Sequence, residues 1–211
     1  MKWDKVEIII NFELSNCLFM ESIHDYVYQP GVLDFVKLSK NFTSLVSSSF
    51  EGTRKEFVRK LLILMPAMYA NFQKLSLNEP IFEGENEKFV GEEDWSSVFQ
   101  NVAGNLGSQN EYLDVPEDEE YDRLELISRS LSEDIADVYQ DIRDFLELYR
   151  NGNEEIMNDA IWECRMNMQN YWGKKLLRAS VNLHRILYTE DEILEEKDRE
   201  WEEKHVNREF N

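Results

Sequence analysis

Seven carboxylates have the spacing in this sequence that could support chemistry. They recur at three- and four-residue intervals in two groups and are Asp134, Asp137, Asp141, Asp144, Glu155, Asp159 and Glu163. Side chains at these intervals share one face of a helix. Two adjacent helices with such acidic pairs can hold Mg²⁺, which binds carboxylate oxygens together with waters and substrate phosphates.

All-helical nucleotide pyrophosphohydrolases use a Glu-x-x-Glu pair on one helix and Glu-x-x-Asp on the next. The nearest match here is Asp134-x-x-Asp137 followed by Glu155-x-x-x-Asp159, so the residue types and the second spacing both differ. Metal-bound phosphates at such a site could be attacked by an activated water. We keep a Mg²⁺-dependent nucleotide phosphohydrolase as the alternative function, with these four residues as metal ligands and Mg²⁺ as its cofactor.

Two long helices must position these acids. Ser130 and Glu133 form a possible capping box at the start of the first helix, and Asn151-Gly152 supplies the left-handed residues that close its C-terminus. Asn153 can cap the second helix, which runs to Tyr188. The aspartates of the first helix lie opposite its apolar stripe, so we expect them to point to solvent. A solvated acidic face is therefore the main interpretation.

The remaining pattern is also helical. Apolar residues recur at helical spacing over 32–46, and Thr53 with Glu56 predicts a capping box before a helix over 54–76. This helix is apolar nearly all round in its middle, so we expect it to be the most central one, kinked or divided at Pro66. A shorter helix is predicted over 92–106.

We therefore predict an all-α fold, a bundle of about five to six helices with a long antiparallel C-terminal helix pair. The predicted divisions are an N-terminal arm over 1–24, a helical domain over 25–188 and a charged tail over 189–211. The acidic stretch that follows the helix over 92–106 is expected to be a solvated linker, and a docking site for a basic partner is the alternative. Gly173, inside the last long helix, is expected where another helix passes closely.

The net charge of −20 disfavours direct nucleic-acid binding and attachment to anionic membranes, which both prefer basic surfaces. The two cysteines form no C-x-x-C pair, so neither a zinc site nor a disulfide framework is expected. The start lacks the unbroken apolar core of a signal peptide, and no apolar run is long enough to span a membrane. We expect a cytoplasmic protein.

Several segments resemble an uncharacterised bacterial family, domain of unknown function 5063. They are GVLDFVKLSKNF (31–42), LLILMPAMY (61–69), DIADVYQDIRDF (134–145), MNDAIWEC (157–164), YWGKKL (171–176) and LHRILY (183–188). The resemblance covers roughly residues 25–188. It implies a helical protein of about 200 residues without assigned activity, and it supplies no catalytic residues.

No P-loop, G-x-G-x-x-G, H-E-x-x-H or G-x-S-x-G motif is present, so the catalytic residues are unknown. We predict a non-enzymatic protein–protein interaction or adaptor module that needs no cofactor and binds an unknown protein partner. Besides the Mg²⁺ alternative, a small-ligand pocket near Trp172 and Tyr139 stays open.

Overall fold

The computed structural model describes residues 22–84, 86–115 and 126–189. The predicted tail beyond residue 189, the arm before residue 22 and most of the acidic linker lie outside these residues. Residues 22–27 form a helical turn whose Ile23 and Val27 are buried in the core. The helical body therefore begins before residue 25, and the expected boundary between arm and domain falls inside this turn.

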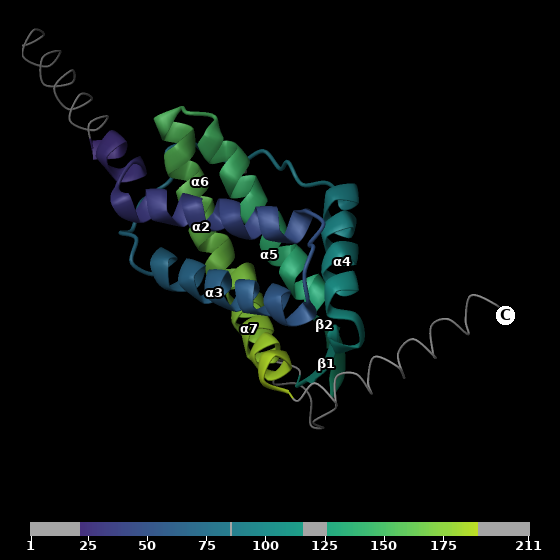
Figure 1. The fold of residues 1–211 in the computed structure, drawn as a ribbon. Coiled ribbons are helices and arrows are strands. Elements are labelled where there is room, and N and C mark those ends of the chain that lie inside the picture. Colours follow the sequence, from purple (N-terminus) through teal and green to yellow (C-terminus); the bar gives the residue numbers. More distant parts are fainter. Residues whose placement is uncertain (1–21, 85, 116–125, 190–211) are drawn as a thin grey trace, which may run out of the picture.

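The fold is an all-α bundle, as predicted. Its helices are α2 (Pro30–Ser47), α3 (Arg54–Phe72), α4 (Glu92–Leu106), α5 (Leu131–Arg150), α6 (Glu154–Asn167) and α7 (Gly173–Tyr188). A 3₁₀ turn, η1 (Gly107–Gln109), follows α4, and a π-helical turn, η2 (Met168–Trp172), joins α6 to α7. Helices α2 and α3 lie side by side and cross over the layer formed by α5, α6 and α7 (Figure 1). Among the described helices, none combines the length and apolar character needed to cross a membrane.

Helix α5, rather than α3, is the most central element. It packs against α2, α4, α6 and α7, whereas α3 packs mainly against α2 and α7. The prediction that α3 is the most central helix is wrong, because Ile63 in its apolar middle is exposed to solvent. Helix α3 also runs unbroken through Pro66, so the predicted division does not occur.

A chain of aromatic rings joins the two layers. Phe35 of α2 lies 4.5 Å from Phe72 of α3 and 5.3 Å from Phe145 of α5, measured between ring centroids. Phe72 meets Trp172 of η2 edge-on at 5.8 Å. Fully burying side chains of this kind stabilises a fold by about 1.5–3 kcal/mol each, so this cluster is a main source of cohesion between the layers.

The predicted helix ends are confirmed where local side chains define them. Thr53 and Glu56 form the capping box of α3, and the Asn153 side chain accepts hydrogen bonds from the first turn of α6. Ser130 accepts from the backbone N–H of Glu133. Gly152 takes a positive φ of 81° at the turn between α5 and α6.

A short antiparallel ribbon was not predicted. Strand β1 (Glu111–Asp114) pairs with β2 (Ile127–Ser130), with Tyr112 opposite Arg129. Asn110, just before β1, satisfies two amides at the start of α5: its carbonyl accepts from the Leu131 N–H and its side chain from the Ser132 N–H. The ribbon therefore fixes the N-terminus of the central helix.

The predicted single helix from Asn153 to Tyr188 is interrupted by η2. A Cβ atom placed on Gly173 would lie 2.4 Å from the carbonyl oxygen of Met168, five residues earlier in the same chain. The close approach that requires glycine is therefore the π turn itself and not a passing helix, which corrects the expectation for this residue.

Gly173→Ala should lower the free energy of unfolding by about 1–3 kcal/mol, because the backbone of η2 must shift to admit the methyl group. The matched control is Gly104→Ala in α4, where an added Cβ meets nothing within 4 Å. That substitution should raise stability by about 0.5–1 kcal/mol through helix propensity. Urea unfolding followed by circular dichroism separates the two, and equal effects would contradict this role of the π turn.

Candidate functional site

The acidic row of α5 faces the protein, not solvent. Asp134 and Asp144 are each 3% exposed, and Asp159 of α6 is equally buried. The expectation of a solvated face is wrong because the side of α5 opposite its apolar stripe is also covered. Helix α7 covers one end of this side, and the segment over 76–91 covers the other. Buried carboxylates need donors, and each finds its own.

Asp134 forms a fork with Arg178 of α7. The Nη2 atom of Arg178 lies 2.7 Å from Oδ1 of Asp134, and Nε lies 3.2 Å from Oδ2. The Tyr112 hydroxyl of β1 also donates to Asp134, and the pKa of Tyr112 is raised by burial and by this carboxylate. Bidentate arginine–carboxylate pairs fix geometry as well as charge, so this fork ties α5, α7 and the ribbon together.

Asp137, one turn later on α5, also binds side chains of neighbouring helices. It accepts a hydrogen bond from the Nε1–H of Trp95 on α4 at 2.8 Å and pairs with Lys175 of α7. Both oxygens of this predicted metal ligand therefore have partners within the chain. The contact links α4, α5 and α7.

The other acids hold the segment over 76–91, which has no regular secondary structure among its described residues. Asp144 accepts from the backbone N–H groups of Phe89 and Val90 at 2.8 and 3.0 Å. Asp159 accepts from those of Ile81 and Phe82 at 2.7 and 2.8 Å. These residues and Glu163, which pairs with Lys88, fasten the segment to α5 and α6. We call residues 76–91 the strap.

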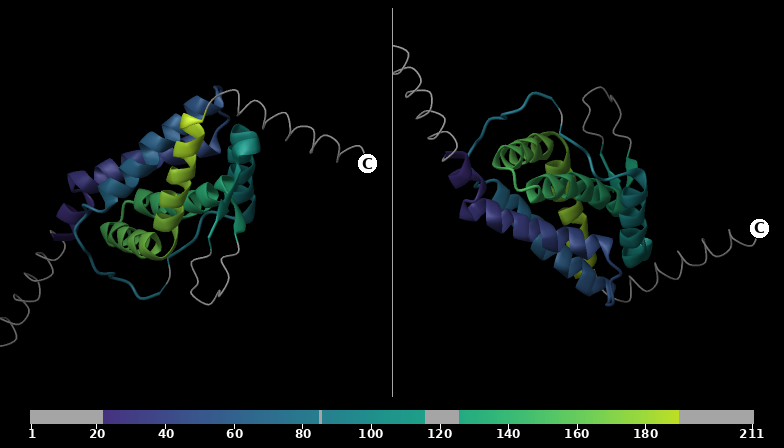
Figure 2. Two further views of the ribbon diagram at one scale, coloured as in Figure 1. Left: turned by 90° about the horizontal axis from the view of Figure 1, so that it is seen from below. Right: turned by 90° about the horizontal axis from the view of Figure 1, so that it is seen from above.

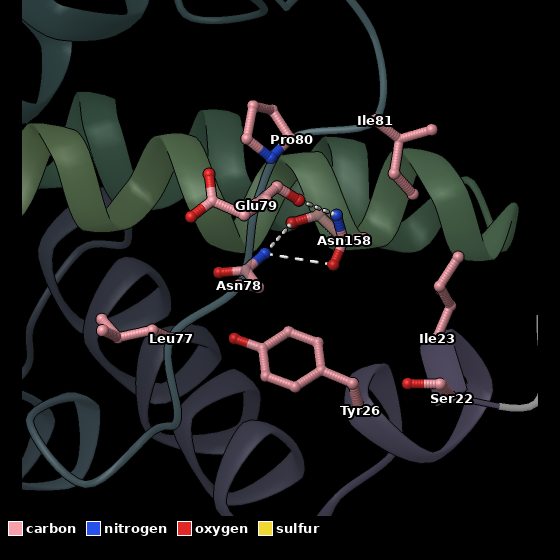
Figure 3. A pocket seen from close by; sticks show the side chains of 9 residues that line it. All are labelled: Ser22, Ile23, Tyr26, Leu77, Asn78, Glu79, Pro80, Ile81 and Asn158. Atoms are coloured by element: carbon pink, nitrogen blue, oxygen red, sulfur yellow. Dashed lines mark hydrogen bonds between the residues drawn. The ribbon is translucent and has the colours of Figure 1, made fainter. Parts of the chain in front are cut away.

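Beneath the first part of the strap lies a cavity of about 450 Å³, lined by residues of 22–26 and 77–81 and by Asn158 (Figure 3). The Asn78 amide donates to the Asn158 carbonyl at 2.9 Å, and Asn158 donates to the Glu79 carbonyl at 2.8 Å. The Tyr26 ring lies across the hollow from this amide pair. Most of these polar atoms hold the strap in place, so the cavity is a consequence of how the strap is fastened.

A smaller cleft of about 240 Å³ opens beside η2, and Asp141 lines it together with Tyr171 and Trp172. Asp141 accepts a hydrogen bond from Asn167 at 2.7 Å, and burial raises the pKa of Asp141 to about 6. Perturbed carboxyl groups in clefts can act as proton donors or acceptors. This cleft therefore holds a carboxyl group with a raised pKa next to two aromatic side chains.

The four predicted metal ligands are not brought together. Asp134 and Asp137 pair with cations of α7, Asp159 pairs with strap amides, and Glu155 lies in the first turn of α6. Over residues 22–84, 86–115 and 126–189, no three His, Cys, Asp or Glu side chains are grouped to hold a metal ion. A small-ligand pocket was predicted near Trp172 and Tyr139. Trp172 lines the cleft beside η2, but Tyr139 is buried and does not line it.

Helix α7 has a second apolar face, which points outward. Five of its six exposed positions follow one another at three- and four-residue steps: Lys174, Leu177, Val181, His184 and Tyr188. At 100° per residue these five positions lie within an arc of about 80°. We call this row the α7 seam. Val181 is 56% exposed and Tyr188 is 72% exposed.

A family model described as Domain of unknown function (DUF5063) matches residues 26–189. The chain belongs to the DUF5063 family. The crystal structure of protein BF1032 from Bacteroides fragilis is similar to it, with 29% sequence identity and a TM-score of 0.69, over 78% of this chain and 97% of that chain. No curated protein matches significantly. The comparisons establish family and fold and assign no activity.

The carboxylates of this DUF5063 protein were predictable from its sequence, but their partners were not. Lys175 and Arg178 lie more than 30 residues from the aspartates they bind. A signal was present: residues 164–189 carry no Asp or Glu, although 43 of 211 residues are acidic. An acid-free basic helix following an acidic one suggests complementary packing.

Asp141→Asn should raise the stability of the DUF5063 protein at pH 8 by about 1–3 kcal/mol. The pKa of Asp141 in the folded protein, about 6, lies above the ordinary value of 3.8. The protonated carboxyl group therefore contributes stability that is fully present below pH 4. That contribution is lost as the pH rises through 6. Urea unfolding at pH 4 and 8 measures the effect. Asp34→Asn, at an exposed site on α2, should change little, and loss of stability in Asp141→Asn at pH 8 would contradict the argument.

Asp159→Asn should destabilise the protein by about 2–3 kcal/mol, because one of two strap amides then faces an N–H group in place of an oxygen. Hydrogen exchange at Ile81 and Phe82 should accelerate more than elsewhere. Glu155→Gln, four residues earlier on α6, is the matched control and should leave exchange in the strap unchanged. Unaltered protection of Ile81 and Phe82 in Asp159→Asn would show that Asp159 does not hold the strap.

Proposed function

We propose that this DUF5063 protein is a non-enzymatic protein-interaction module that binds another helix along the α7 seam. The observation that carries the proposal is the outward apolar row itself. Leu177 is 45% exposed and Val181 is 56% exposed on a helix whose opposite face is already buried in the core. Large apolar side chains gathered on one exposed face are typical of interaction sites.

The spacing of the seam fits a helical partner. Steps of three, four, three and four residues from Lys174 to Tyr188 are those of alternating a and d positions in a coiled coil. A helix laid along α7 would cover Leu177, Val181 and Tyr188 together. Figure 2, in its left view, shows α7 on the near side of the body.

The use of the carboxylates supports a binding role over phosphate chemistry. Asp134, Asp137 and Asp159, which the alternative assigns to Mg²⁺, accept hydrogen bonds from cations, an indole and backbone amides of this chain. A metal ion would have to displace these donors. We place the module in the cytoplasm, which agrees with the free thiol of buried Cys164.

The test is a photo-crosslinking residue at position 181 of the full chain, expressed in its native host. A partner should be captured there and not from the matched exposed position Gln100 on α4, and mass spectrometry should place the contact in a helix of the partner. Leu177→Asp should reduce capture at least tenfold without lowering the melting temperature. Equal capture from positions 181 and 100, or contact with a non-helical segment, would contradict the proposal.

A further inference from the structure

The cleft beside η2 has the shape and lining of a small binding site, and it does not depend on the proposed function. Its walls come from α5, the end of α6, η2 and the start of α7, and its volume is about 240 Å³. That is room for about eight water molecules at about 30 Å³ each, which suits a small ligand. π turns within helices are frequent at functional sites, and this cleft opens at such a turn.

The charges around this cleft are not balanced. The charged side chains that line the cleft and the narrow gap adjoining it are Asp137, Asp141, Asp144, Glu163, Lys88 and Lys175. Lys175 of α7 pairs with Asp137. Lys88 of the strap pairs with Glu163, and Asp144 accepts from two strap amides. Four carboxylates therefore face two cations, and Asp141 has no ion pair with any residue that the structure describes.

Two neighbouring acceptors in the lining are unused. The Oδ1 atom of Asp141 accepts from Asn167 at 2.7 Å, but its Oδ2 atom receives no hydrogen bond from the described part of the chain. The side-chain amide of Gln140, which also lines the cleft, makes no hydrogen bond over the same ranges. A carboxylate sheltered from water needs donors, and burial accordingly raises the pKa of Asp141. A ligand can supply the donors that the chain does not.

A primary ammonium group fits these acceptors. It carries one positive charge and three N–H donors, which can be shared between Asp141 and the Gln140 carbonyl oxygen. A guanidinium group uses both oxygens of a carboxylate, and here Asn167 already occupies Oδ1. Tyr171, exposed at the cleft, adds an aromatic ring that attracts cations. The net charge of −20 also draws cations toward the protein.

We propose that the cleft beside η2 binds a primary alkylammonium group, with Asp141 as its counter-ion and the Gln140 side chain as a second acceptor. The apolar body of the ligand lies against Tyr171 and Trp172. The indole N–H of Trp172 already donates to the Cys164 carbonyl at 3.0 Å, so Trp172 offers apolar contact only. Two sources carry this group: a free amine of low molecular weight and a lysine side chain of a peptide.

The first test compares three cations of equal charge on the isotopically labelled full chain at pH 7.5. Titration with n-butylammonium, followed by NMR at the side-chain amides of Gln140 and Asn167, should give a dissociation constant of about 1–10 mM, in keeping with so small a ligand. Butyltrimethylammonium, which has no N–H group, and n-propylguanidinium should each bind at least fivefold more weakly. Equal binding of all three would reflect only attraction to a negative protein and would overturn the proposal.

The second test removes the counter-ion. Asp141→Asn should weaken n-butylammonium at least tenfold, and the stability expected for this variant keeps unfolding from explaining the loss. Asp34→Asn should change nothing. In the unaltered chain, binding should weaken about tenfold between pH 7.5 and 5, because Asp141, with its pKa of about 6, becomes neutral.

Two other groups near Asp141 titrate abnormally. Burial raises the pKa of the Cys164 thiol, which stays neutral over this range, and burial also raises the pKa of Asp144. The pH dependence should disappear in Asp141→Asn. Its persistence there would assign the effect to Asp144 and overturn the role of Asp141.

A capped tripeptide with lysine at its centre distinguishes the two sources. Tighter binding of the tripeptide than of n-butylammonium assigns the site to a lysine side chain, and the reverse order assigns it to a free amine. Binding of neither up to about 50 mM, or binding that is unchanged in Asp141→Asn, would overturn the proposal. None of these results bears on the α7 seam, which crosslinking at position 181 tests separately.

Discussion

The structure depends on finding donors for carboxylates that have been taken out of water. Removing a carboxylate from solvent costs several kcal/mol unless cations or N–H groups replace the lost hydration. Asp134 meets Arg178, Asp137 meets Lys175 and Trp95, and Asp159 meets two backbone amides. These donors belong to α4, α7 and the strap. The acids of α5 and α6 therefore decide where the ribbon, α4, α7 and the strap must lie.

The two sides of α5 stabilise the fold through different interactions. Its apolar side packs into the aromatic cluster around Phe35 and Phe145, which supplies non-directional cohesion. Its acidic side supplies direction, because hydrogen bonds to a carboxylate constrain both distance and angle. Asp144 and Asp159 hold amides of the strap at fixed points, which helps a segment without helix or strand to keep one path over α6.

The sequence was sufficient to predict hydrogen bonds between residues that are close together in the chain. The cap at Asn153 and the box of Thr53 with Glu56 were predictable because donor and acceptor lie within three residues. The burial of Asp134 was not, because its partner Arg178 lies 44 residues away and a periodicity argument assigns every polar face to solvent. The ribbon was missed because strands as short as EYLD and ISRS show no apolar alternation.

The π turn also sets the phase of the last helix. A π turn contains one residue more than an α turn, and each α-helical residue advances the direction of a side chain by about 100°. The residue accommodated in η2 therefore rotates every side chain of α7 by that angle relative to a straight continuation of α6. This offset turns Leu176 and Leu183 inward and leaves Leu177 and Val181 outside. One extra residue, marked by Gly173, determines which side of α7 belongs to the core and which remains available to other molecules.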